Sequence, residues 1–148
     1  MSASSERRSK RSPGGVPLRL QIECSFAAVR RCAVQIRGFL LANGLPEKDV
    51  WACELAFVEG CNNAVQHTPT SRIGKTLLVE MWCNATHVEL RINDHTHGFD
   101  IPAETALPTP EQESGRGIFL MRSLMDHVDY IRNSSSNCLV LRKAVTGI

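Results

Sequence analysis

The chain has 148 residues, of which 43% are hydrophobic and 22% charged, and its formal net charge is +2. This length is enough for one domain with its own core. The basic excess belongs to the first sixteen residues, which contain Arg7, Arg8, Lys10 and Arg11. The rest of the chain has no such excess, which argues against a nucleic-acid-binding face. No apolar run is long enough to cross a membrane, and the basic start lacks the apolar segment of a signal peptide.

We expect residues 1–16, rich in Ser, Arg and Gly, to form a disordered basic leader, and residues 17–145 to form one domain. The six cysteines include no Cys-x-x-Cys pair. Free thiols on apolar faces explain them better than a disulfide framework or a zinc site, so we expect a protein of the reducing cytoplasm.

The first expected element is a strand over residues 18–24, where apolar and polar residues alternate. Ser25 is a typical N-cap for the helix that follows, and Asn43-Gly44 is a typical end. One side of this helix carries the apolar residues Val29, Ala33, Ile36 and Leu40. That spacing predicts a helix with one buried face.

A second helix is expected from Pro46, which suits a first helical turn, to a stop before Thr68-Pro69. Residues four apart lie nearly above one another on a helix, so its polar residues form one stripe, made of Glu59, Asn63 and His67. Its neighbouring edge has the spacing of a stripe that faces the core, made of Trp51, Leu55, Val58 and Val65.

The second half of the chain predicts two hairpins and a helix. Residues 76–83 and 86–93 form the first hairpin, and residues 127–132 and 138–143 the second. Between them, a Pro-rich segment over 101–114 is predicted to be a lid, and a helix follows Gly117. The fold class is therefore α+β: a two-layer α/β sandwich with a mixed, mostly antiparallel sheet and helices on one face.

The chemistry of the polar positions suggests a magnesium–nucleotide site. An amide oxygen such as that of Asn63 is a hard ligand for Mg²⁺, and the carboxylate of Glu59 can take a proton from an attacking hydroxyl. Asp94, at a strand end, can accept a hydrogen bond from an adenine amino group. Gly115 and Gly117 flank a helix start, where backbone N–H groups can approach phosphates. Taken alone, Glu59 would be interpreted as a solvated helix acid, and its position next to Asn63 and the later parts favours a general base.

The order of these parts resembles the anti-sigma factor serine/threonine kinases, a branch of the histidine kinase-like ATPases with the Bergerat fold. Glu59-x-x-x-Asn63-Ala64-x-x-His67 matches the asparagine box of that branch, and Asp94 matches the acid of its first glycine box. Gly115-Arg116-Gly117 matches the second glycine box. The similarity extends over residues 18–143.

The resemblance implies a function as well as a fold. It implies ATP and Mg²⁺ as cofactors, Glu59 as catalytic base and Asn63 as the magnesium ligand. The remaining nucleotide-binding positions would be Asp94, Gly98, Gly115, Arg116 and Gly117. It further implies an anti-sigma factor that binds a sigma factor and phosphorylates an anti-anti-sigma partner of the STAS class, and that forms a homodimer.

One departure from the family pattern leaves alternatives open. Thr96 replaces the first glycine of the usual Asp-x-Gly-x-Gly, and its Cβ can crowd the base pocket. This replacement is the only support in the sequence for one alternative, a degenerate partner-binding module without catalysis. Another alternative is an ATPase subunit or a detached histidine-kinase catalytic domain, and the lack of a separate long dimerisation helix with a phospho-acceptor histidine counts against it. His95 and His97 suggest a weaker third possibility, a metal site with Asp94 and His67. For His67 itself, capping of the helix and lining of the site are both open.

Overall fold

The computed structural model describes residues 15–68, 76–94, 116–132 and 136–145. Within these ranges it has three helices and five strands, in the order β1 (Leu18–Glu23), α2 (Phe26–Ala42), α3 (Glu47–Gln66), β2 (Thr76–Cys83), β3 (His87–Asp94), α4 (Arg116–Leu124), β4 (His127–Arg132) and β5 (Asn137–Ala144). Both predicted hairpins are present, each with strand ends within one residue of those expected.

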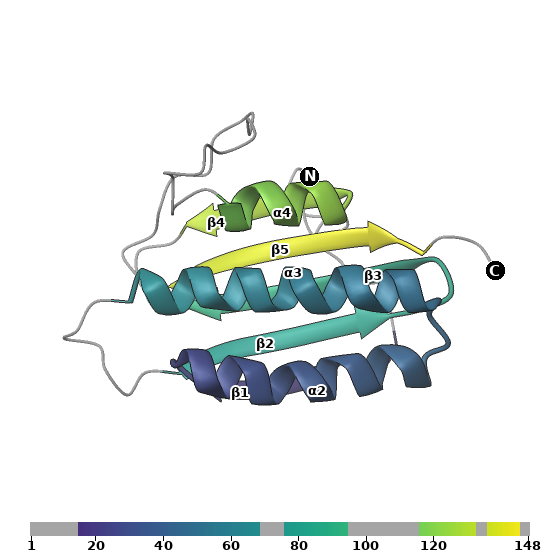
Figure 1. Ribbon diagram of the computed structural model, residues 1–148, viewed down its shortest axis with the longest axis horizontal. Coiled ribbons are helices and arrows are strands. Elements are labelled where there is room, and N and C mark those ends of the chain that lie inside the picture. Colours follow the sequence, from purple (N-terminus) through teal and green to yellow (C-terminus); the bar gives the residue numbers. More distant parts are fainter. Residues whose placement is uncertain (1–14, 69–75, 95–115, 133–135, 146–148) are drawn as a thin grey trace, which may run out of the picture.

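The strands form one sheet in the order β1-β2-β3-β5-β4, and the three helices cover one of its faces (Figure 1). The predicted two-layer α+β sandwich is confirmed. All four strand pairings are antiparallel, so the described sheet is not mixed. The crossover from β3 through α4 returns the chain to the far edge at β4, and β5 then inserts between β4 and β3. This topology puts the end of β3 directly beside the start of β5.

Helix α2 has the boundaries and the buried face that its sequence predicts. The hydroxyl of Ser25 accepts a hydrogen bond from the backbone N–H of Ala28 at 3.1 Å, which caps the helix start. At the other end, Gly44 has a φ of +81°, a left-handed conformation that glycine adopts without strain. The predicted apolar residues Val29, Ala33, Ile36 and Leu40 are all buried.

The predicted core-facing stripe of α3 was wrong for Trp51 and only partly right beyond it, since Val58 and Val65 pack against the core. The side chain of Trp51 is 58% exposed, and Leu55, Val58 and Val65 are only partly buried. A second apolar stripe faces the sheet instead, and its members include Val50, Cys53, Ala56, Phe57, Gly60, Cys61 and Ala64. Most of these side chains are small, so α3 can lie close to the strands, which the bulky indole of Trp51 would prevent.

Gly60 marks the closest approach of α3 to the sheet. A Cβ at this position would lie 2.7 Å from Cδ1 of Ile92 and 3.1 Å from Cδ2 of Leu139. Both distances are shorter than ordinary van der Waals contact, so a methyl group here requires the packing to shift. The glycine is therefore needed for helix–sheet packing.

We expect Gly60→Ala to lower the free energy of unfolding by about 1–3 kcal/mol, because overpacking outweighs the better helix propensity of alanine. Urea denaturation measures the change. Gly38→Ala is the matched control, since Gly38 lies in α2 with no atom within 4 Å of an added Cβ. That substitution should stabilise the protein by about 0.5–1 kcal/mol. Equal effects of the two substitutions would contradict the packing role of Gly60.

Among the described residues, no helix combines the length and the apolar character that a membrane span requires.

Candidate functional site

Four chain segments with the predicted polar residues meet at one end of the molecule. The end of α3, the start of α4, the end of β3 and the start of β5 all lie at the left side of Figure 1. Helix α3 packs against α4 on one side and against β3 and β5 beneath it. Segments far apart in the sequence thus bring Glu59, Asn63, Asp94 and Gly117 to the same end of the fold.

Glu59 and Gly117 are direct neighbours. A Cβ added at Gly117 would lie 3.2 Å from Oε2 of Glu59, so a side chain at this position would crowd the carboxylate. Glu59 is partly buried, and burial raises the pKa of its carboxyl above the usual value, because desolvation disfavours the charged form. A carboxylate with a raised pKa is a better proton acceptor than a fully solvated one.

Asp94 is a buried carboxylate at the last position of β3, with 2% of its surface exposed. Its neighbour across the sheet is Asn137, the first residue of β5, which is 3% exposed. Nδ2 of Asn137 donates a hydrogen bond to Oδ1 of Asp94 at 3.2 Å. The amide therefore fixes the orientation of the carboxylate.

Asn137 was not identified from the sequence. The only signal in the sequence is its place at the start of a strand, and the pairing with Asp94 depends on the β3–β5 register, which crosses 43 residues. With this residue included, the two strand ends present a carboxylate and a carboxamide together. Such a pair can read the hydrogen-bonding edge of a planar heterocycle.

Asn63 and His67 follow Glu59 on successive turns of α3. His67 is the C-cap residue of α3, and its Nδ1 lies 2.8 Å from the backbone carbonyl oxygen of Asn63. The imidazole therefore makes the capping contact that the sequence left open. Asn63 is partly buried, so the residue keeps some contact with solvent.

Several predicted residues lie outside the described part of the chain. These are Thr96, Gly98, Gly115, the two histidines His95 and His97, and the predicted lid over residues 101–114. Arg116 is described only as the first residue of α4. The metal-site alternative depends on His95 and His97, so it also lies outside the described residues.

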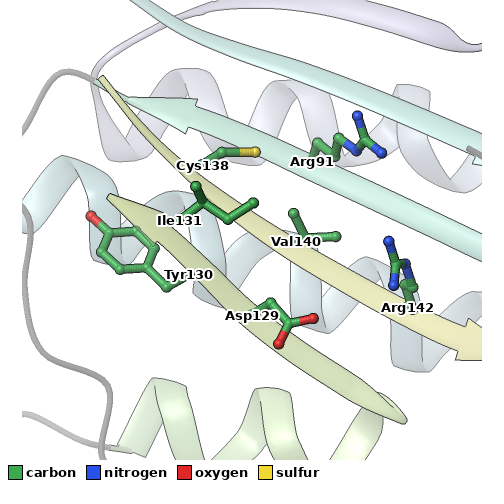
Figure 2. Close-up of a pocket in the computed structure, with 7 residues that line it drawn as sticks. All are labelled: Arg91, Asp129, Tyr130, Ile131, Cys138, Val140 and Arg142. Carbon is green, nitrogen blue, oxygen red and sulfur yellow. The ribbon is translucent and has the colours of Figure 1, made fainter. Parts of the chain in front are cut away.

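A separate cleft of about 440 Å³ lies on the face of the sheet opposite the helices (Figure 2). It is lined by Arg91, Asp129, Tyr130, Ile131, Cys138, Val140 and Arg142. Next to it, the buried carboxylate of Glu89 is 2.6 Å from Nε of Arg142 and 2.8 Å from Nε of Arg91. None of Glu59, Asn63, Asp94 and Gly117 lines this cleft, so it is distinct from the predicted site. The Glu89–Arg142 pair links β3 to β5, and the Glu89–Arg91 pair lies within β3.

Comparison with known proteins agrees with the geometry. Residues 22–143 match the histidine kinase-like ATPase domain, and this match spans most of the chain. The chain belongs to this family. Membership implies an ATP-binding domain, and the matched segment contains every described residue of the candidate site. A search of curated proteins by sequence gave no match.

Two solved structures have the same fold. One contains the RsbU and RsbW domains of Rv1364c from Mycobacterium tuberculosis, with a TM-score of 0.67 and 17% identity over 93% of this ATPase-family chain. The chain spans only 35% of that larger protein. The other is the SiaB–SiaC complex from Pseudomonas aeruginosa, with a TM-score of 0.63 and 13% identity, covering 97% of this chain and 96% of the other.

The described residues are compatible with a bound nucleotide. Gly117 leaves open, beside Glu59, a space that a Cβ would fill. It lies in the first turn of α4, where backbone N–H groups have no acceptor within the helix. Asp94 and Asn137 supply an acceptor and an amide at the strand ends. Asn63 supplies a neutral oxygen of the kind that Mg²⁺ prefers.

Proposed function

We propose that this ATPase-family protein is an anti-sigma factor with ATP-dependent protein serine/threonine kinase activity toward an anti-anti-sigma partner of the STAS class. The observation that carries the proposal is the contact between Glu59 and Gly117, because it joins the asparagine box to the second glycine box. The likeness of the fold to the RsbW-containing structure and to the SiaB–SiaC complex supports a partner-binding role. The proposal includes a homodimer located in the cytoplasm.

Each described residue has a distinct task in this proposal. Asp94, held by Asn137, accepts a hydrogen bond from the adenine amino group and so selects the base. Backbone N–H groups at the start of α4, around Gly117, contact phosphate oxygens. Asn63 holds Mg²⁺, which when bound neutralises charge on the phosphates. Gly98, Gly115 and Arg116 are proposed to complete the nucleotide site.

Glu59 is the proposed catalytic base. Its carboxylate takes the proton from a serine or threonine hydroxyl of the partner as the oxygen of that hydroxyl attacks the terminal phosphorus. The bond from this phosphorus to the bridging oxygen of ATP breaks, and ADP leaves. Burial raises the pKa of Glu59 and thereby strengthens it as a proton acceptor.

Titration calorimetry of the purified chain with ATP tests the nucleotide site. We expect binding that depends on Mg²⁺, because the proposed magnesium ligand Asn63 belongs to the same site. Asn63→Ala should remove most of the Mg²⁺ dependence and leave a weaker, metal-independent affinity. Absence of any binding at millimolar ATP would instead favour the degenerate partner-binding module, for which the replacement of glycine by Thr96 is the only support in the sequence.

The raised pKa of Glu59 predicts the pH dependence of the reaction. A base acts only when deprotonated, so the rate should increase with pH through the pKa of Glu59 and level off above it. Because burial raises this pKa, the part of the pH–rate profile in which the rate increases should lie above the pH at which a solvated glutamate titrates. Single-turnover phosphorylation at a series of pH values measures the profile. A rate that stays constant down to pH 4 would exclude Glu59 as the base.

A further inference from the structure

The outward side of the α2–α3 pair carries an unusual number of large apolar side chains. Four of the six large hydrophobic residues that the described structure exposes lie on these two helices: Phe26, Val34, Leu41 and Trp51. Val34 is 72% exposed and Trp51 58%. We call these four residues, together with Arg30 and Arg31, the α2–α3 patch. An exposed apolar cluster of this kind marks an interaction site more often than an isolated surface residue does.

The α2 part of the patch follows one line along the helix. Residues 26, 30, 34 and 41 recur at spacings of four and seven, which places them on one side of an α-helix. The adjoining side of α2 is buried through residues such as Val29, Ile36 and Leu40. The line from Phe26 to Leu41 is about 22 Å long, which equals about four helical turns.

The charge of the patch is positive. Helix α2 contains three arginines and no acidic residue. Arg37 is paired with Glu47 at 3.0 Å and with Glu54 at 3.3 Å, so this cluster of one cation and two carboxylates carries one negative charge. Counted with Arg30 and Arg31, these residues still sum to a net charge of +1. Arg30 and Arg31 are exposed, and neither forms an ion pair within the described ranges. The patch therefore combines apolar side chains with two exposed cations that form no ion pair with a described residue.

We propose that the α2–α3 patch docks an acidic amphipathic helix of a partner protein. The backbone groups of α2 are bonded within the helix, so an occupant can be held only through side chains, as when two amphipathic helices pack together. An apolar stripe of four turns on the occupant fits Phe26, Val34 and Leu41, and flanking carboxylates fit Arg30 and Arg31. This inference rests on the partner-binding half of the proposed function and is independent of phosphoryl transfer.

Two other occupants fit the patch less well. A second copy that used the same patch would bring one arginine-rich helix against another, and like charges in contact are unfavourable. A membrane surface favours a helix with a broad apolar face flanked by many cations. Helix α2 has its broad apolar face in the core and exposes only three large apolar residues.

Trp51 allows a direct test in solution. The full-length chain with Trp82→Phe has Trp51 as its only tryptophan, because the sequence contains two. The probes are two helical peptides of about 22 residues, with the same leucine stripe and either glutamates or lysines on the other side. No nucleotide is added, so failure of the kinase proposal does not affect the result. We expect the acidic peptide to shift Trp51 emission to shorter wavelength and to bind at least tenfold more tightly than the basic one.

Single substitutions make the test specific. In the reporter chain, Val34→Ser should weaken acidic-peptide binding about tenfold, and Arg30→Glu should abolish the preference for the acidic peptide. Leu78→Ser is the matched control, because Leu78 is also exposed but lies on β2, and it should change nothing. Equal affinity for both peptides would overturn the proposal, and so would the absence of binding to either one. So would an emission shift with phosphatidylserine vesicles, or a dimer that Val34→Ser dissociates.

Discussion

Glu59→Gln is expected to slow phosphorylation of the partner by about 10²–10⁴-fold, which is the range that general-base catalysis contributes. Glutamine has nearly the same shape as glutamate, so the contact with Gly117 and the affinity for ATP should persist. The amide cannot accept a proton, and the loss should therefore appear in kcat. Single-turnover transfer of the terminal phosphate, measured beside ATP titration, separates the chemical step from binding.

Glu54→Gln is the matched control for this experiment. Glu54 lies on the same helix and is paired with Arg37 instead of facing Gly117. Its replacement should leave the rate within about twofold of the original, because a surface ion pair contributes little to stability or geometry. A Glu59→Gln protein that phosphorylates its partner at the original rate would show that another group takes the proton.

Asp94→Asn is expected to weaken ATP binding by about tenfold to a hundredfold, because one hydrogen bond between a charged acceptor and the adenine amino group is lost. The new amide can donate a hydrogen bond, and the carbonyl oxygen of guanine can accept one. GTP affinity should therefore rise while ATP affinity falls. The ratio of ATP to GTP affinity then falls further than ATP affinity itself. Calorimetric titration with both nucleotides measures the two quantities.

Asp129→Asn provides the matched control for Asp94→Asn. It removes a carboxylate from β4, at the cleft on the other face of the sheet, and should leave both affinities unchanged. Thermal unfolding without ligand shows whether Asp94→Asn also loosens the pair with Asn137. Unchanged ATP and GTP affinities in a stable Asp94→Asn protein would mean that the base does not bind at the β3–β5 strand ends.

The helix boundaries were predictable because they depend on local chemistry. Ser25 caps α2 through its own hydroxyl, and Gly44 ends the helix through its own φ angle, so neither requires knowledge of distant residues. The face of α3 was not predictable in the same way. Its sequence has two adjacent apolar stripes, and only the space beside Ile92 and Leu139 decides that the stripe with Gly60 faces the sheet.

The candidate site also contains residues that local spacing predicts and residues that only the tertiary fold brings together. The polar stripe of Glu59 and Asn63 was visible because both residues lie on one helix at a fixed spacing. Asn137 was not visible, since its role exists only through a strand register between distant segments. Glu89 was missed for a related reason. Nothing in the alternating strand sequence indicates that this acid is buried, and its partners are Arg91 on the same strand and Arg142 on β5.

The position of β1 has a consequence for the order in which this protein folds. The hairpins β2–β3 and β4–β5 and the α2–α3 pair each join neighbouring segments, so their contacts close short loops. Strand β1 pairs at longer range, because its partner β2 follows both helices, and the nearest pair, Glu23–Thr76, closes a loop of about fifty residues. The β3–β5 pairing closes a loop of similar length, since Asp94 and Asn137 are 43 residues apart. Both pairings are therefore expected to form after the local hairpins, and the edge of β2 stays unpaired until β1 docks.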